Sequence, residues 1–125
     1  MPIEFSIDHT AKIPPFEQIK HTIIEAIDRQ ETRADEKLPA IRSLAKQLGV
    51  AVNTVARSYR ELEDEGYVTT QGRSGTRINP QAIPADIALM QYAHAYIKNA
   101  VACGATKDAA LTAIEHHWPH NTTPG

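Results

Sequence analysis

The sequence has little of what an exported or membrane-bound protein needs. Its 125 residues contain no run of 18 apolar residues, which is about the length that a helix needs to cross a bilayer. The single cysteine, Cys103, has no partner for an intramolecular disulfide. The first four residues, Met-Pro-Ile-Glu, lack the basic and apolar stretches that begin a secretory signal. We therefore expect a cytoplasmic protein.

The sequence motifs of common enzyme classes are missing as well. There is no Gly-x-Ser-x-Gly elbow, no phosphate-binding loop followed by Lys-Ser or Lys-Thr, and no His-Glu-x-x-His zinc motif. We therefore expect neither an enzymatic activity nor a cofactor.

Three of the six histidines lie close together near the end of the sequence, at His116, His117 and His120. Histidine is a common ligand of zinc and nickel, so a metal-sensing site is one interpretation. Pro119 interrupts the helical register between His116 and His120, which favours the plainer interpretation of a fraying C-terminus. We predict no metal site.

The formal net charge of −2 conceals a basic stretch in the middle of the sequence. Residues 37–77 carry seven Lys and Arg side chains against four Asp and Glu, whereas residues 1–36 carry four against eight. The four acids of the basic stretch all fall within residues 61–65. A local basic face on an acidic protein suits the binding of phosphate groups.

Apolar spacing predicts a short strand and then a long helix. Residues 3–8 alternate apolar and polar side chains, which is typical of a strand. Residues 15–30 are predicted to be helical, because apolar residues recur at spacings of three and four and Pro15 suits a first helical turn. The apolar stripe of this helix consists of Phe16, Ile19, Ile23, Ile24 and Ile27.

A second and a third helix follow, separated by a tight turn. The second is expected at residues 40–48 and ends at Gly49, which can adopt the left-handed conformation of a helix C-cap. Asn53 is expected to be the N-cap of the third helix, at residues 54–65. The buried side of these two helices is predicted to consist of Ile41, Leu44, Ala45, Leu48, Val55, Tyr59 and Leu62.

Two short strands, at residues 67–70 and 76–78, enclose a glycine-containing turn and predict a β-hairpin. The order helix, short helix, tight turn, helix and hairpin is that of a winged helix-turn-helix. We assign residues 1–79 to this domain. The expected fold class is mostly α with a small β-hairpin.

Residues 80–125 are predicted to form a short two-helix tail after a proline-containing linker. Helices are expected at residues 86–103 and 106–118, with Thr106 as the N-cap of the second and Cys103 buried. Both helices carry apolar stripes, and a second subunit is an economical way to cover such faces. The predicted dimerisation surface consists of Ile87, Met90, Tyr92, Tyr96, Ile97, Val101, Leu111, Ile114 and Trp118.

Motifs spread through residues 3–78 carry a resemblance to a known family. They read Leu-Pro-Ala-Ile-Arg-Ser-Leu-Ala from residue 38, Leu-Gly-Val from 48, Asn-Thr-Val from 53, Tyr-Arg-Glu-Leu-Glu-Asp-Glu-Gly-Tyr-Val from 59 and Gly-Thr from 75. In this order and spacing they strongly resemble the GntR family of bacterial regulators. The short helical tail resembles that of the YtrA-type subfamily, which implies that the tail dimerises the protein.

The resemblance implies that the first domain binds double-stranded DNA. It places DNA contacts at the start of the second helix, in the turn and first residues of the third helix, and at the hairpin tip. Many family members carry arginine where Val52 and Ala56 stand, which leaves open the base pattern that this chain reads. The implied DNA-binding residues are Arg42, Ala51, Val52, Asn53, Thr54, Arg57, Gly72, Arg73, Ser74 and Gly75.

Together these observations predict a sequence-specific transcription regulator, in the simplest case a repressor, that binds an inverted-repeat operator as a homodimer. A small-molecule effector could act on it by shifting the geometry of the dimer. The alternative is a metal- or protein-binding sensor module in which the winged helix serves as a scaffold.

Overall fold

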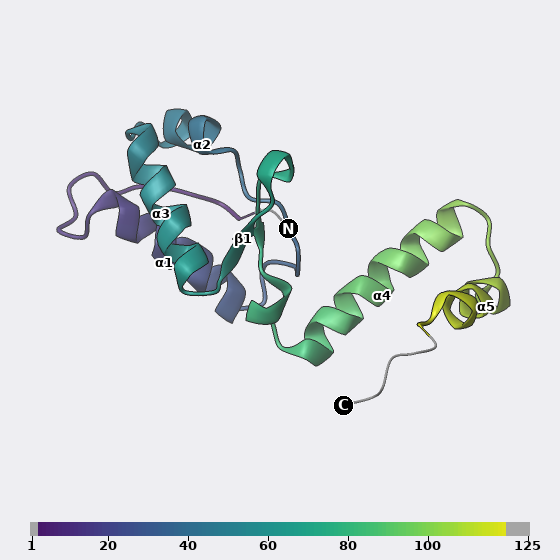
Figure 1. Ribbon diagram of the computed structural model, residues 1–125. Helices are drawn as coiled ribbons and strands as arrows, with labels where there is room; N and C mark the ends of the chain where they lie inside the picture. The colour runs from purple at the N-terminus through teal and green to yellow at the C-terminus, as the bar shows by residue number, and fades with distance from the viewer. Residues whose placement is uncertain (1–2, 120–125) are drawn as a thin grey trace. The chain divides into compact units, whose positions relative to one another are not determined.

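The computed structural model describes residues 3–119 and divides into two compact units (Figure 1). The first unit extends to Leu89 and the second begins at Met90. The boundary expected at residue 79 therefore lies inside the first unit. The reason is that Ile83 and Ala88 are almost fully buried in the core of that unit.

Helix α1 (Pro15–Asp28) begins at the expected proline and buries three of the predicted isoleucines together with Ala26. The segment before it is not a strand, so that prediction is wrong. Its apolar side chains nevertheless pack against the core at every second residue, at Ile3, Phe5 and Ile7. Gln18 of α1 holds the end of this segment, because its amide exchanges hydrogen bonds with both backbone groups of Asp8, at 2.9 and 3.0 Å. The alternating pattern therefore predicted correctly which side chains of this segment pack against the core, although the segment pairs with no strand.

The helix-turn-helix consists of α2 (Ile41–Leu48) and α3 (Val52–Asp64). Gly49 between them has φ +67°, the left-handed C-cap that the sequence predicts. The N-cap of α3 is Ala51 and not Asn53, so α3 begins two residues earlier than expected. An asparagine cap is worth only about 1 kcal/mol, and core packing outweighs it in setting where the helix starts.

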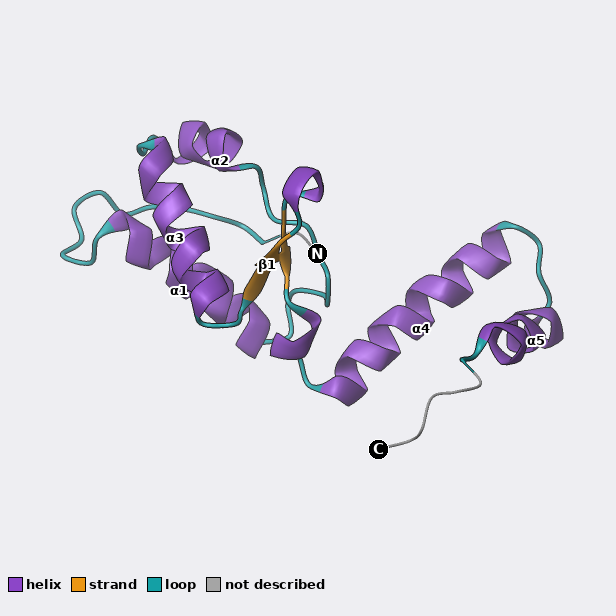
Figure 2. Ribbon diagram, viewed as in Figure 1, coloured by secondary structure: helices purple, strands orange, loops and turns teal. Residues whose placement is uncertain are grey.

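The wing is an antiparallel hairpin of β1 (Val68–Thr70) and β2 (Thr76–Ile78), with Val68 opposite Ile78 (Figure 2). A short 3₁₀ turn, Gly72–Ser74, forms its tip. The outer edge of β2 is also paired, because Lys37 forms a bridge with Arg77 and the Leu38 amide donates to the Thr76 carbonyl at 2.8 Å. The loop before α2 thus fixes the hairpin to the rest of the unit.

The core of the first unit lies where α3 packs against α1, α2 and β1. Its largest fully buried apolar side chains come from all of these elements and from β2: Ile19, Ile23, Leu44, Val55, Leu62, Val68 and Ile78. Tyr59 of α3 is buried too, and its hydroxyl donates to the Pro39 carbonyl at 2.8 Å. Burial raises the pKa of Tyr59, so the phenol stays protonated and keeps donating. This bond ties α3 to the residues that lead into α2.

The two remaining helices are α4 (Ala85–Ala102) and α5 (Lys107–His117). Thr106 caps α5 as predicted, since its hydroxyl accepts from the Ala109 amide at 3.1 Å. Cys103, expected to be buried, is exposed at the end of α4, because that end of the helix projects its side chains into solvent. Among the residues that the structure describes, no helix is long and apolar enough to span a membrane.

Candidate nucleic-acid interface

The helix-turn-helix presents two helix N-termini without side-chain caps. At Ala40 before α2 and at Ala51 before α3, the side chain is a methyl group and accepts no hydrogen bond. The amide groups of a first helical turn have no partners inside the helix, and they favour an anion. Arg42 lies in the first turn of α2 and is exposed. The two helix starts are therefore suited to contacts with phosphate groups.

The outer face of α3 carries the polar groups that could read bases. At 100° per residue, Asn53, Arg57 and Arg60 fall on the side of α3 opposite its buried residues Val55, Ser58, Tyr59 and Leu62. All three outer residues are exposed. Of the other predicted contacts, Ala51 and Val52 are exposed at the start of α3, and Thr54 is half-buried. Arg60 was not among the predicted DNA-binding residues, although its spacing from Asn53 and Arg57 would have indicated it.

Arg57 is held in one place by two neighbours. Its Nε–H donates to Glu61 Oε2 at 2.8 Å, and its guanidinium carbon lies 3.6 Å from the centre of the Phe16 ring. The side chain remains 52% exposed, so the guanidinium is accessible while being held. A guanidinium can bind a phosphate or the O6 and N7 atoms of guanine through two parallel hydrogen bonds.

The acidic cluster at residues 61–65 is largely used within the protein. Glu61 bridges Arg57 and Lys20, Glu65 also pairs with Lys20 at 3.1 Å, and Glu63 accepts from the Thr70 amide at 2.9 Å. Hydrogen bonds from Arg57 and then from Lys20 hold the pKa of Glu61 below its usual value, so it is ionised at neutral pH. These acids lie at the C-terminal end of α3. Neither Arg73 of the wing nor Arg42 of α2 has a partner among them.

Not every arginine of the basic stretch is available for DNA. Arg77 Nη1 donates to the Asp35 carbonyl at 3.1 Å and the residue is half-buried. Its charge therefore stabilises the loop beside β2. The exposed arginines of the stretch are Arg42, Arg57, Arg60 and Arg73.

The wing tip depends on two glycines with positive φ angles. Gly72 has φ +57° and Gly75 has φ +79° with ψ −164°. The Gly75 amide donates to the Gly72 carbonyl at 3.1 Å, and the Gln71 amide donates to the Gly75 carbonyl at 2.9 Å. Arg73 and Ser74 are exposed between the two glycines. The turn thus presents one cationic side chain, that of Arg73, and a backbone with few side-chain atoms. Such a turn can approach a sugar-phosphate chain closely.

Gly75→Ala is expected to lower the free energy of unfolding by about 1–3 kcal/mol, because its backbone angles lie in a region that is essentially restricted to glycine. The new Cβ would also lie 3.3 Å from the Lys37 Cε atom. Urea denaturation measures the change. Gly72→Ala is the matched control and should lose less than Gly75→Ala, because its Cβ would have no neighbour within 4 Å and because other residues also adopt its left-handed conformation, at a cost of roughly 1–2 kcal/mol. Equal losses in the two variants would contradict the assignment of special strain to Gly75.

The predicted dimerisation residues separate into three groups. Five of them line an apolar groove of about 540 Å³ between α4 and α5, namely Tyr96, Ile97, Val101, Leu111 and Ile114. Tyr96 fixes the groove, since its hydroxyl donates to the Ala110 carbonyl at 2.8 Å. Met90, Tyr92 and Trp118 are exposed but do not line it. Ile87 differs from all of these, because it packs against the core of the first unit.

The histidines supply no metal centre in the part of the chain that the structure describes. No group of three or more potential ligands is found within residues 3–119. His116 and His117 lie edge to face, with ring centres 5.3 Å apart, and His117 Nδ1 lies 2.9 Å from the Ala113 carbonyl. The third residue of the candidate set, His120, lies outside the described residues.

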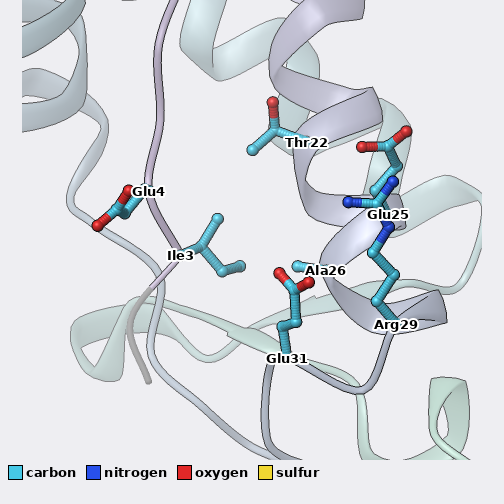
Figure 3. Close-up of a pocket in the computed structure, with 7 residues that line it drawn as sticks. All are labelled: Ile3, Glu4, Thr22, Glu25, Ala26, Arg29 and Glu31. Carbon is cyan, nitrogen blue, oxygen red and sulfur yellow. The ribbon is translucent and has the colours of Figure 1, made fainter.

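A second hollow, of about 500 Å³, lies between the N-terminal segment and the end of α1 (Figure 3). Ile3 points into it and Glu4 points away. All of its charged side chains, Glu4, Glu25, Arg29 and Glu31, are exposed to solvent. No buried charge is present to bind a ligand there, and none of its residues belongs to the face described above.

The chain is similar in sequence to known transcription regulators. Residues 15–78 match the model of the family described as bacterial regulatory proteins, gntR family. The chain is 41% identical over 110 residues to the HTH-type transcriptional regulator Rv1152 of Mycobacterium tuberculosis, covering 88% of this chain and 90% of that protein. It is 36% identical over 76 residues to the HTH-type transcriptional repressor YtrA of Bacillus subtilis, covering 61% of this chain and 58% of that protein.

Among solved structures, the chain is similar to YtrA from Sulfolobus acidocaldarius, a GntR-family transcription factor. The TM-score is 0.56 at 33% identity, and the match covers 88% of this chain and 92% of that one. The similarity therefore extends beyond the winged helix into the tail helices. It agrees with the predicted fold class and with the YtrA-type assignment.

Proposed function

The chain belongs to the gntR family of bacterial regulatory proteins, and from this premise we propose that it is a transcriptional repressor that binds an inverted-repeat operator as a homodimer. The family assignment makes it a transcription regulator with a winged-helix DNA-binding domain. Repression, the form of the operator and the dimer are the parts proposed here.

The observation that carries the proposal is the outer face of α3. Asn53, Arg57 and Arg60 share it, on a helix of 13 residues whose N-terminus has no side-chain cap. A helix of this kind fits the major groove, where arginine pairs with guanine and asparagine with adenine. Arg42 and the open start of α2 would bind the flanking phosphates. Arg73 of the wing would lie along the adjacent minor groove.

The exposed apolar side chains of α4 and α5 support the homodimer. Ile97, Val101, Leu111 and Ile114 are 41–68% exposed around one apolar groove. A second copy would remove this surface from water, and a closed two-fold dimer is the commonest way of doing so. Two-fold symmetry places two recognition helices about one DNA turn apart, which requires an inverted-repeat operator.

Repression is proposed because YtrA of Bacillus subtilis, which is 36% identical to this chain over 76 residues, is a transcriptional repressor. A dimer bound across a promoter blocks polymerase without any further contact. An effector would need to bind two states of the dimer with different affinities in order to relieve the block.

The test is a fluorescence-anisotropy titration of the purified protein against DNA from upstream of its own gene, with scrambled DNA as the control. We expect saturation at two protomers per duplex and an affinity at least about 1000-fold above that of the control. The affinity is expected to fall by at least roughly 1000-fold between about 50 and 200 mM salt, because bound phosphates release counterions. Specific binding that is insensitive to salt, or saturation at one protomer, would contradict the proposal.

A further inference from the structure

Three contacts join the first turns of α1 to the middle of α3. The Ser58 hydroxyl, which is fully buried, lies 2.8 Å from the Phe16 carbonyl and 3.0 Å from the Thr54 carbonyl, and shares its one proton between them. One turn further along both helices, Lys20 Nζ lies 3.0 Å from Glu61 Oε1. Between these two contacts, the Phe16 ring lies under the guanidinium of Arg57.

The backbone around Phe16 is held by contacts other than the one to Arg57. The Phe16 carbonyl is held by Ser58, and the next turn of α1 is held by Lys20, whose side chain is only 13% exposed. Partial burial disfavours the charged form of Lys20, but the hydrogen bonds that its ammonium donates to Glu61 and Glu65 outweigh this, so the pKa of Lys20 is raised. The part of the α1 backbone that carries the ring is thus fixed to α3 independently of Arg57.

Arg57 is gripped from two directions. The Phe16 ring supports the flat face of the guanidinium, and Glu61 Oε2 takes the Nε–H at 2.8 Å. Glu61 is itself held by Lys20 through its other oxygen. Since Nε is occupied, the four N–H groups on the two Nη atoms are the donors left for a ligand. One N–H group from each Nη can form the two parallel hydrogen bonds that a guanine edge or a phosphate accepts.

We propose that Phe16 is a positioning residue for DNA recognition. Its ring, together with the Glu61 carboxylate that Lys20 holds, orders the Arg57 guanidinium on α3 before DNA binds. This inference rests on the proposed function, because it assumes that Arg57 contacts the operator. Phe16 itself lies at the start of α1 and needs no contact with DNA for this role. An arginine that is already ordered loses less side-chain freedom on binding than a mobile one.

The experiment is a double-mutant cycle on a duplex that the wild-type chain selects from a random-sequence pool. Phe16→Leu removes the ring but keeps an apolar side chain, and is expected to weaken binding by about 2- to 5-fold per half-site, the range of an exposed cation–π contact. Arg57→Ala is expected to weaken it by roughly 5- to 150-fold per half-site. In the Arg57→Ala background, Phe16→Leu should have no further effect.

Two further readouts separate positioning from mere structural support. Phe16→Tyr keeps the ring and should restore wild-type affinity, whereas Phe16→Met should behave like Phe16→Leu. Single-base operator variants should lose discrimination at the same base pair in Phe16→Leu and in Arg57→Ala. Thermal melting of each variant checks that it folds, and the Met variant replaces the Leu variant if the latter does not.

The inference is overturned if Phe16→Leu weakens binding equally with and without Arg57, or if it tightens binding, which would mean that the stack withholds Arg57 from DNA. If Phe16→Leu binds with wild-type affinity while Arg57→Ala binds more weakly, the inference is also overturned. The proposed function is then left intact. If Arg57→Ala binds as well as wild type, the assumed contact itself is absent, and this result refutes the role of Arg57 separately.

Discussion

Replacing both Arg42 and Arg57 by alanine is expected to weaken operator binding by at least about 100-fold while the fold and the dimer persist. Each guanidinium contact is worth roughly 1–3 kcal/mol, and a dimer loses each of them twice. Both side chains are exposed, and neither belongs to the buried core. Anisotropy titration against the operator duplex measures the loss, and circular dichroism verifies the fold.

The matched control for this double variant is Arg29→Ala. Arg29 is an exposed arginine at the end of α1, outside the proposed DNA-binding face. Its removal changes the net charge in the same direction, so it accounts for the general electrostatic effect. In a plot of the logarithm of the binding constant against the logarithm of the salt concentration, the slope should become less steep by about 1 for each phosphate contact removed in the double variant. If Arg29→Ala weakens binding as much as the double variant does, the loss reflects net charge and not a specific face.

Ile97→Glu is expected to convert the dimer into a monomer at concentrations where the wild-type chain is dimeric. Ile97 lines the apolar groove between α4 and α5 and is 56% exposed in the single chain, so the fold itself tolerates the change. An unpaired carboxylate enclosed in an apolar interface costs several kcal/mol, which corresponds to an increase of at least about 100-fold in the dimer dissociation constant. Sedimentation velocity measures this directly.

Lys98→Glu is the control for the dimer prediction, because Lys98 is the next residue on α4, is exposed and does not line the groove. It introduces the same carboxylate outside the proposed interface and should remain dimeric. The monomeric Ile97→Glu variant should also bind the two half-sites of the operator independently and more weakly, since it loses the gain from tethering. A dimeric Ile97→Glu variant would place the subunit contact elsewhere on the chain.

The elements of this fold were predictable because their signals are local. Apolar residues at spacings of three and four identified α1, α2 and α3, and Gly49 identified the turn between the last two. The same periodicity marked Val55, Tyr59 and Leu62 as buried, and they are. Errors arose where a local preference competed with packing. Asn53 is a good capping residue but lies inside α3, and residues 3–8 alternate like a strand but have no strand to pair with.

The candidate site was predictable in its chemistry and less so in its arrangement. Arginine at positions 42 and 57 indicated groups able to bind bases or phosphates, and the family motifs indicated where they would lie. Arg77 has the same chemistry and belongs to the same basic stretch, yet it donates to the Asp35 carbonyl. The sequence placed Arg73 in the turn and Arg77 in a strand, but the partner of Arg77 could not be predicted, because it belongs to a loop 42 residues away.

By itself, the sequence determined the helices, the turn, the hairpin, the buried stripes of α1, α2 and α3 and the family, since these depend on neighbouring residues and on the spacing of residue types. The tertiary structure alone decided which charged side chains are bound within the protein and which are exposed for contact with DNA. It joined Phe16 to Arg57 and Lys20 to Glu61, pairs that lie 41 residues apart in the chain. Such contacts depend on how two helices cross, and the side-chain atoms that meet at a crossing are set by the packing of the whole core and not by either helix alone.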